Sequence, residues 1–345
     1  MKILCEFTAS GPSYVRSGWG HAFRACGHDF RFWKPETKSI MDAMAEFEPD
    51  IFLGTTYGVD RAMEKCIAAR PRMKVGLFAS AWGPYLADVD LKRYPIVVAG
   101  EQEKVIIERL KRTTGRPDFV FIHVTDKYLD GTMGGWRGIG VNPIGVLNAA
   151  DVLVYYSSAP RIDLTCDVTF VGGRWNFKAR NIDPYILPLC HPSSGLSVKI
   201  FGNTTWPVAQ YLGNIEDGLV KHLFASATVC PNVSEPHSTG LGFDVIERPF
   251  KVLSSGGFCV SDYVDEAREI FGESELVMCK TAAEFHQTIR HFVAHPAERL
   301  PYMVAGRNKV LESHTYFDRV SQFFTGFGLN AEAQAILRRK QEILA

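Results

Sequence analysis

Short apolar runs alternate with helical patterns along the first half of the chain. The runs with strand character are Lys2–Thr8, His28–Trp33, Asp50–Thr55, Lys74–Ala79, Ile96–Gly100 and Asp118–Val124. Between them, apolar residues recur at three- and four-residue spacing, which predicts helices at Ser39–Phe47, Asp60–Ala69 and Glu101–Lys111. Buried parallel strands need helices on both faces of their sheet, and this alternation supplies them. The pattern therefore predicts a β-α-β domain.

A glycine-rich stretch interrupts this rhythm between residues 126 and 148. It contains Gly131, Gly134, Gly135, Gly138, Gly140 and Gly145, with Pro143 among them. Glycine at this density is typical of a linker or hinge, so we expect one here.

The alternation restarts after this stretch. Strands are predicted at Asp167–Val171, Val198–Phe201, Thr228–Pro231, Phe258–Ser261 and Leu276–Cys279. Helices are predicted at Phe177–Ile186, Asp217–Ser226, Glu247–Ser254, Asp265–Phe271, Ala282–Ala294, Glu298–Glu312 and Asn330–Leu344. The pattern predicts two doubly wound α/β halves. Because such sheets bind ligands at the carboxyl ends of their strands, we expect a cleft between facing halves.

Composition excludes several classes of protein. The 345 residues are 46% hydrophobic and 22% charged, as in a globular protein, and the length suits two domains. The formal net charge is zero, so no overall charge draws the chain to nucleic acid or to an anionic membrane. The eight cysteines are scattered singly, without metal-ligand or redox spacing, and are expected to be reduced. No secretory leader and no membrane-spanning run is predicted, so a cytoplasmic location is expected.

The first candidate site opens the second half. A predicted strand leads into Gly172 and Gly173, and Arg174 and Lys178 follow where a helix begins. Two cations beside a helix N-terminus suit a diphosphate. The alternative is an ordinary tight turn with two solvated cations. The Walker sequence and the Gly-x-Gly-x-x-Gly fingerprint are both absent here.

A second candidate site lies between residues 233 and 263. A polar, glycine-containing loop leads into a helix that has Pro249 near its first turn and ends at Gly256-Gly257. The amide end of this helix, with Arg248, predicts a site for an anion or a polyol.

Three segments of this half together resemble a known family. They are Arg248-Pro-Phe-Lys-Val-Leu-Ser-Ser-Gly-Gly-Phe-Cys-Val-Ser-Asp262, Ala294-His-Pro-Ala-Glu-Arg299 and Ala305-Gly-Arg-Asn-Lys-Val-Leu-Glu-Ser-His-Thr-Tyr316. Their order and spacing resemble the C-terminal domain of CgeB-type (spore-maturation-like) glycosyltransferases over about 150 residues. The first half is similar only loosely, through the loop-helix Gly18–Gly27 and His28.

The resemblance implies an α/β GT-B fold with two facing Rossmann-like domains and a C-terminal helix that crosses back to the first. The domains expected are 1–148 for the acceptor, including the linker 126–148, 149–327 for a nucleotide sugar, and the crossing helix 328–345. The implied function is transfer of a hexose or pentose from a donor, UDP-linked in expectation, to an acceptor hydroxyl. The resemblance also implies that no metal and no cofactor is required. Rival interpretations are a nucleotide-sugar 2-epimerase of the same fold and a non-catalytic nucleotide-sugar-binding protein.

Site residues follow from these motifs. Donor contacts are expected from Gly172, Gly173, Arg174, Lys178, Gly202, Asn203, His237, Gly240, Leu241, Gly242, Glu247, Arg248 and Lys251. Arg174 and Lys178 would stabilise the departing diphosphate. Lys251 stands where many relatives have a glutamate that holds the donor ribose, and Glu247, one turn earlier, could replace that carboxylate.

Acceptor contacts are expected in the first half, from Tyr14, Arg16, Trp19, Asp88, Asp90 and His123. An inverting enzyme needs a general base, for which Glu101 is the first candidate and Asp88, Asp90 and His21 are the others. A retaining enzyme needs none. The acceptor is expected to be a saccharide or glycan hydroxyl, or the hydroxymethyl group of a modified pyrimidine in DNA.

Overall fold

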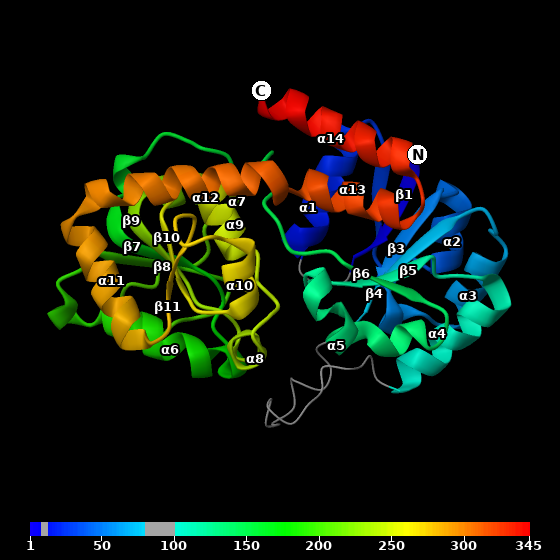
Figure 1. Ribbon diagram of the computed structural model, residues 1–345, viewed down its shortest axis with the longest axis horizontal. Coiled ribbons are helices and arrows are strands. Elements are labelled where there is room, and N and C mark those ends of the chain that lie inside the picture. The colour runs from blue at the N-terminus through cyan, green and yellow to red at the C-terminus, as the bar shows by residue number, and fades with distance from the viewer. Residues whose placement is uncertain (8–12, 80–100) are drawn as a thin grey trace. The chain divides into compact units, whose positions relative to one another are not determined.

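The computed structural model describes residues 1–7, 13–79 and 101–345. The chain divides into two compact units. Unit 1 contains Met1–Leu147 and Tyr316–Ala345, and unit 2 contains Asn148–Thr315. Each unit is built on one parallel sheet with helices around it (Figure 1).

The sheet of unit 1 has the strand order β2-β1-β3-β4-β5-β6 and is parallel throughout. Its strands are β1 (Lys2–Glu6), β2 (Asp29–Trp33), β3 (Ile51–Thr55), β4 (Lys74–Phe78), β5 (Phe119–Ile122) and β6 (Asn142–Gly145). The first four strands and β5 confirm the sequence prediction within one or two residues. The predicted strand Ile96–Gly100 lies outside the described residues.

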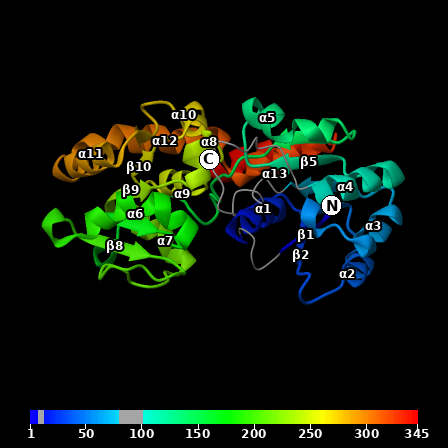
Figure 2. The same cartoon turned by 90° about the horizontal axis from the view of Figure 1, so that it is seen from below.

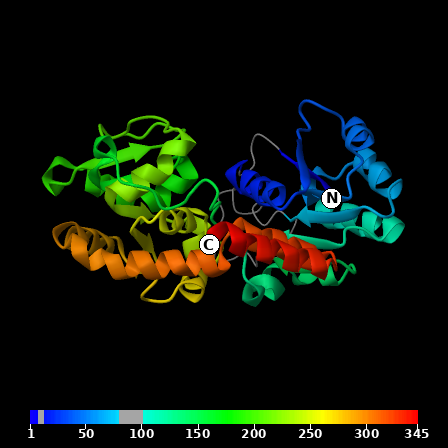
Figure 3. The ribbon, with the colours of Figure 1, turned by 90° about the horizontal axis from the view of Figure 1, so that it is seen from above.

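The helices of unit 1 come from both ends of the chain. They are α1 (Ser13–Ala25), α2 (Ile40–Phe47), α3 (Arg61–Ala68), α4 (Glu101–Thr114), α5 (Asp126–Arg137), α13 (Tyr316–Gly326) and α14 (Asn330–Leu344), with a 3-10 turn at Thr56–Gly58. α1 packs on α13, and α13 packs on α14 (Figures 2 and 3). Gly18 permits the first contact, because a Cβ atom there would lie 2.1 Å from the Tyr316 ring.

Local sequence explains where the first helices begin. Ser39 accepts a hydrogen bond from the amide of Asp42 and caps α2, and Asp60 caps α3 in the same way through the amide of Met63. In α2, the residues Ile40, Ala43, Met44 and Phe47 are buried at three- and four-residue spacing, as the periodicity predicted.

The stretch expected as a linker differs from that expectation. Residues 126–137 form α5, and residues 142–145 form β6, which pairs with β5 at the edge of the sheet. The glycines concealed an apolar stripe, because Leu129, Met133 and Trp136 share one buried face of α5. Gly131 and Gly134 have open space beside them, so they add no constraint on that face. Pro143 is tolerated because β6 is an edge strand.

The sheet of unit 2 has the order β11-β10-β9-β7-β8 and is also parallel. Its strands are β7 (Cys166–Val171), β8 (Val198–Phe201), β9 (Ala227–Asn232), β10 (Cys259–Asp262) and β11 (Val277–Cys279). All five confirm the predicted strands. A core that includes Val168, Phe170, Ile200, Val229 and Phe258 joins the strands to the surrounding helices.

Eight helices of unit 2 are needed to place the site and its surroundings. They are α6 (Asn176–Cys190), α7 (Asp217–Ser226), α8 (Pro236–Leu241), α9 (Arg248–Ser254), α10 (Asp265–Ile270), α11 (Ala282–Ala294), the 3-10 helix η6 (Pro296–Arg299) and α12 (Leu300–Ser313). Six of them were predicted from periodicity. The short helix α8 was not, because its six residues contain a proline, a glycine and two hydroxyl side chains. None of the helices in the described part of the chain is long and apolar enough to span a membrane.

Candidate functional site

The strand order locates the candidate site of unit 2. β8 and β9 flank β7 on opposite sides, so the topological switch point lies at the carboxyl ends of β7 and β9. The segment after β7 begins at Gly172, and the segment after β9 begins at Val233. Both carry residues that the sequence proposed as donor contacts.

Glycines bring the segments after β7 and β8 together. A Cβ atom on Gly202 would lie 2.3 Å from the carbonyl oxygen of Gly172, and one on Gly173 would lie 2.6 Å from Asn203 Oδ1. A Cβ on Gly172 would lie 2.7 Å from Arg248 Nη2. The protein's own backbone therefore requires a glycine at position 202, whereas Gly172 and Gly173 face the ends of side chains.

Arg174 is held by a carboxylate. Its Nε and Nη2 atoms donate to the two oxygens of Asp183, at 2.8 and 2.6 Å, and both side chains remain about one-quarter exposed. Asp183 lies on α6, two turns beyond its beginning. This bidentate geometry fixes the guanidinium plane at the amino end of α6.

Lys178 forms a second ion pair deeper in the same site. Its ammonium lies 2.9 Å from Glu235 Oε1 and 4.8 Å from the centre of the Trp175 ring. Only 5% of Lys178 is exposed. Burial lowers the pKa of this ammonium, the nearby Arg248 lowers it further, and Glu235 opposes both effects. Two cations, Lys178 and Arg248, and one carboxylate, Glu235, therefore act on one another at this position.

Arg248 bridges the ends of β7 and β9. Its Nε donates to the Val171 carbonyl at 3.0 Å, and its Nη1 donates to Asn232 Oδ1 at 2.9 Å and to the Val233 carbonyl at 3.4 Å. The guanidinium also stacks on Phe170, with 4.5 Å between its carbon and the ring centre. Arg248 therefore holds the switch point together as well as adding charge to it.

The loop around α8 contributes a further polar pair. His237 Nε2 lies 3.0 Å from Asp244 Oδ2, and the imidazole stacks on Phe177 of α6. Gly240 and Leu241 form the last residues of α8, and Gly242 follows with φ of 81°, a conformation that favours glycine.

Lys251 and Glu247 lie together in α9 and just before it. Their charged atoms are 3.8 Å apart and both side chains are largely buried, with Lys251 over the ring of Tyr155. Burial lowers the pKa of Lys251, and Glu247 partly offsets this. A carboxylate thus stands next to the lysine that replaces the expected glutamate.

Sequence reasoning missed the partners of these cations. Asp183 and Glu235 neutralise Arg174 and Lys178, and Asn232 accepts from Arg248. Glu235 stands in the polar loop before α8, within the second candidate site. An acid in that loop could have been proposed from the sequence as a partner for one of the predicted phosphate-binding cations. The sequence offered no such indication for Asp183, because its pairing with Arg174 depends on the tertiary position of α6 relative to the Arg174 side chain.

Unit 1 has its own switch point at the carboxyl ends of β1 and β3. A cavity there is lined by Cys5, Glu6, Arg16, Trp19, Leu53, Gly54, Tyr57, Phe78, Phe121 and His123. Three of the predicted acceptor residues, Arg16, Trp19 and His123, are therefore brought together. Tyr14 lies on α1, two residues before Arg16, whereas Asp88, Asp90 and the side chain of Glu101 lie outside the described residues.

Trp19 is more buried than its predicted role suggested. Only 4% of it is exposed, and its indole packs edge-on against Phe121 and Phe323. His123 is also buried, and its Nδ1 lies 2.7 Å from the Val146 carbonyl oxygen. Because a carbonyl can only accept, that nitrogen carries a proton.

Glu6 is the titratable group that the sequence did not single out. Its Oε2 accepts from the amide and the hydroxyl of Thr55, at 2.8 and 2.9 Å, and 3% of the residue is exposed. Burial raises the pKa of its carboxyl group, while the bonds from Thr55 and the charge of Arg16 oppose the rise. Its position at the carboxyl end of β1 could have indicated a site residue, because parallel sheets bind ligands at that edge.

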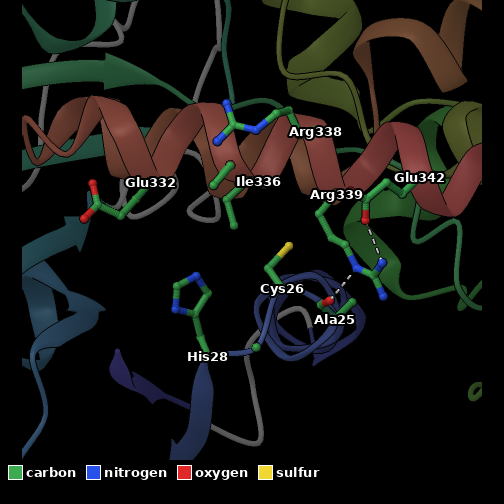
Figure 4. A pocket seen from close by; sticks show the side chains of 10 residues that line it. Ala25, Cys26, His28, Glu332, Ile336, Arg338, Arg339 and Glu342 are labelled. Atoms are coloured by element: carbon green, nitrogen blue, oxygen red, sulfur yellow. Dashed lines mark hydrogen bonds and ion pairs between the residues drawn. The ribbon is translucent and has the colours of Figure 1, made fainter.

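A second cavity of unit 1 lies elsewhere, between the end of α1 and α14 (Figure 4). Arg339 Nε donates to the Ala25 carbonyl at 3.1 Å, and Cys26 and His28 face Ile336 across the gap. Because His28 immediately precedes β2, this cavity is at the amino-terminal edge of the sheet. Parallel sheets bind substrates at the opposite edge.

Comparisons with known proteins agree with this architecture. Residues 186–325 match the family described as glycosyl transferase-like. No curated protein sequence matches the chain. The fold is similar to that of sucrose-phosphate synthase from Thermosynechococcus elongatus, with a TM-score of 0.63 at 10% identity, covering 95% of this chain and 98% of that one.

Further solved structures share the fold at similar coverage. Anabaena Alr3699/HepE, solved with UDP and glucose, has a TM-score of 0.58 at 10% identity, covering 95% of this chain and 99% of its own. T4 phage BGT, solved with UDP and Mn²⁺, has a TM-score of 0.53 at 13% identity, covering 94% and 99%. The DNA modifying enzyme β-glucosyltransferase is similar at a TM-score of 0.52 and 12% identity, covering 97% and 99%. The chain therefore has the GT-B fold of these structures, and its residues 186–325 are similar to a glycosyl transferase-like family.

Proposed function

We propose that this protein transfers a sugar from a nucleoside-diphosphate sugar, UDP-linked, to an acceptor hydroxyl, and that it is of the CgeB type. The observation that carries the proposal is the grouping of Arg174, Lys178 and Arg248 at the switch point of the unit 2 sheet. This edge is where open α/β sheets bind nucleotides. UDP is the ligand in two of the structures with the same fold.

The chemistry assigned to unit 2 is stabilisation of the leaving group. As the bond from the anomeric carbon to the phosphate oxygen breaks, its electron pair passes to the diphosphate. A preorganised pair of cations in a buried site stabilises that charge more than water does. Lys178, which is 5% exposed and whose ammonium is held by Glu235, is suited to stabilise this charge. Because side chains supply the positive charge, we propose that transfer needs no metal ion.

Lys251 and Glu247 suit the ribose end of the donor. In the proposed arrangement Glu247 accepts from ribose hydroxyls, since its carboxylate lies 3.8 Å from Lys251 at the position that relatives give to a glutamate. His237, held by Asp244, suits a hydroxyl of the sugar.

Unit 1, Met1–Leu147 with Tyr316–Ala345, is assigned to the acceptor, and unit 2 to the donor. The cavity at the carboxyl ends of β1 and β3 combines aromatic walls from Trp19, Phe78 and Phe121 with Glu6 and Arg16. At about 30 Å³ this cavity takes a single hydroxyl group rather than a whole ring, and the acceptor proposed to present that hydroxyl is a saccharide or glycan. A hydroxymethylated pyrimidine in DNA is the other acceptor, and a DNA modifying enzyme shares the fold.

Binding and turnover test the proposal separately. Calorimetry with UDP and UDP-glucose is expected to show one site, weakened by Lys178→Ala. A panel of saccharides, glycans and hydroxymethylated DNA is then incubated with UDP-sugars, with and without EDTA, and the products are read by mass spectrometry. The proposal predicts a glycosylated product that persists in EDTA. Donor rearranged without any acceptor would support a 2-epimerase, and binding without turnover would support a non-catalytic protein.

A further inference from the structure

The last turn of α11 carries two histidines that the proposed function does not use. His291 and His295 are one helical turn apart, and η6 follows at once with Glu298. All three residues are exposed, and one potential ligand atom of each lies within 4.8 Å of the others. Nitrogen from imidazole and oxygen from carboxylate are ligands that Zn²⁺ accepts.

The side chains already face one another. The His291 and His295 rings are stacked with their centres 4.6 Å apart, and His291 Nε2 lies 2.7 Å from Glu298 Oε2. Ligand atoms around a tetrahedral zinc ion are about 3.4 Å apart, as follows from zinc–nitrogen distances near 2.1 Å. Small rotations of exposed side chains suffice to reach that spacing.

The backbone orients one ring for coordination. His295 Nδ1 lies 2.9 Å from the His291 carbonyl oxygen, and a carbonyl only accepts, so Nδ1 donates. In the neutral ring the lone pair is then on Nε2. Histidines that bind metals commonly donate their other nitrogen to a backbone carbonyl in this way, which fixes the tautomer and the ring plane.

The helix end adds an electrostatic contribution. His291 lies in the last turn of α11 and His295 is its C-cap, where the helix dipole places partial negative charge. Glu298 adds a full negative charge. When a divalent ion binds, it replaces the proton that His291 and Glu298 share, and that proton is released to solvent.

We propose that His291, His295 and Glu298 bind one divalent transition-metal ion of the Zn²⁺ class, with water in the remaining position. The contacts of the neighbouring residues place this site at the amino-terminal edge of the unit 2 sheet. Arg290 donates to the Ser194 carbonyl before β8, and Arg299 donates to the Thr228 carbonyl at the beginning of β9. Lys178 and Arg248 are at the opposite edge, so the ion joins α11 to η6 and takes no part in glycosyl transfer.

Titration of the tag-free full-length protein with zinc tests the site. After removal of metal with a chelator and exchange into a non-coordinating buffer, calorimetry is expected to show one zinc ion per chain. His291→Ala and His295→Ala should each weaken binding at least about tenfold, and Glu298→Gln should weaken it less. His222→Ala is the matched control, since it removes a histidine on α7 and leaves all three ligands in place. Zinc should also raise the melting temperature of the wild type and of the control, but not of the double-histidine variant.

Two results would overturn the proposal. One is binding weaker than about 1 mM in the wild type, which is no better than an adventitious ion. The other is zinc affinity that both histidine variants retain, which would put the ion elsewhere. The proposed function stands apart from either result, because UDP affinity measured in the same samples is expected to be equal with and without zinc.

Discussion

Arg248 donates from Nη1 to Asn232 Oδ1 over 2.9 Å, and this bond ties the beginning of α9 to the end of β9. The same guanidinium reaches the Val171 carbonyl at the end of β7. One side chain therefore closes the switch point of the unit 2 sheet. Its positive charge is available to a ligand only in the orientation that these bonds impose.

Arg248→Ala is therefore expected to lower stability as well as donor affinity. Removing the guanidinium leaves Asn232 Oδ1 and two backbone carbonyls without this donor, which costs about 2–3 kcal/mol of unfolding free energy. Urea unfolding measures the loss, and calorimetry with UDP measures the affinity. Arg248→Lys keeps the charge but cannot reach both strands. Its stability and its UDP affinity should therefore lie between those of the wild type and of Arg248→Ala. An unchanged unfolding midpoint in Arg248→Ala would contradict the bridging role.

The pair of Arg174 and Asp183 allows a matched test of the proposed phosphate site. Arg174→Ala is expected to weaken UDP binding by about 1.5–3 kcal/mol, the range for a charge-assisted hydrogen bond. Asp183→Asn removes the partner carboxylate and leaves the guanidinium, so UDP should bind equally well or more tightly. If both variants bind UDP as the wild type does, Arg174 is a structural residue held by Asp183.

Lys178 predicts how donor binding depends on pH. Burial lowers the pKa of its ammonium, so in the free protein it loses its proton at a lower pH than an ordinary lysine does. UDP favours the charged form. UDP affinity should therefore fall as pH rises through this lowered pKa, below the usual lysine range near 10.4.

Lys178→Arg is the control for this titration. Arginine keeps its charge across the same pH range, so the variant should bind more weakly overall but lose the alkaline decline. Calorimetry of UDP binding at several pH values compares the two curves. The same alkaline decline in the variant would assign the titration to another group.

The sequence predicted the sheets well because their strands are short apolar runs that alternate with amphipathic helices. It failed at α5, where glycines on the open face hid the buried stripe of Leu129, Met133 and Trp136. It also missed α13, whose Phe323 packs on Trp19 in the core of unit 1 although the two residues stand near opposite ends of the chain. Periodicity describes one segment and carries no information about distant partners.

The candidate site was also predictable only in part: the sequence indicated its cations but not their carboxylate partners. Cations near glycines indicated Arg174, Lys178 and Arg248. Arg174 and Lys178 follow the carboxyl end of β7, the Arg248 guanidinium reaches that end, and their role in donor binding stays a prediction. Their carboxylate partners depend on tertiary packing. Glu6 was overlooked because its place at a strand end, although a usable signal, does not distinguish a buried glutamate from a solvated one.

Trp19 should behave first as a core residue. Because 4% of it is exposed and it packs on Phe121 and Phe323, Trp19→Ala is expected to cost about 3–5 kcal/mol of unfolding free energy. That loss would obscure any effect on the acceptor. Trp19→Phe keeps most of the packing. If Trp19 contacts the acceptor, this variant should have a higher apparent KM for the acceptor and an unchanged affinity for the donor. A normal melting temperature in Trp19→Ala would contradict the burial.

We predict that, in an inverting transfer, Glu6 takes the proton of the acceptor hydroxyl. It lines the cavity, Thr55 fixes its Oε2, and burial raises the pKa of its carboxyl group. A base acts only when ionised, so kcat should fall as pH drops through this raised pKa, above the usual glutamate value near 4.3. Glu6→Gln should lose most of the turnover and the acid limb of the profile while it binds UDP normally.

Glu6→Gln is expected to lower turnover but not stability, so its melting temperature distinguishes loss of catalysis from misfolding. A raised pKa means that the folded protein binds this proton more tightly than the unfolded chain, so the stability it contributes is present at low pH and declines as pH rises through the raised pKa. Glu6→Gln removes the buried charge and keeps an oxygen for Thr55, so its melting temperature at neutral pH should equal or exceed that of the wild type. Glu103→Gln is the matched control, since that carboxyl group also has a raised pKa and bonds to Thr56 but does not line the cavity. Full turnover in Glu6→Gln, or an equal loss in Glu103→Gln, would remove Glu6 from the role of base.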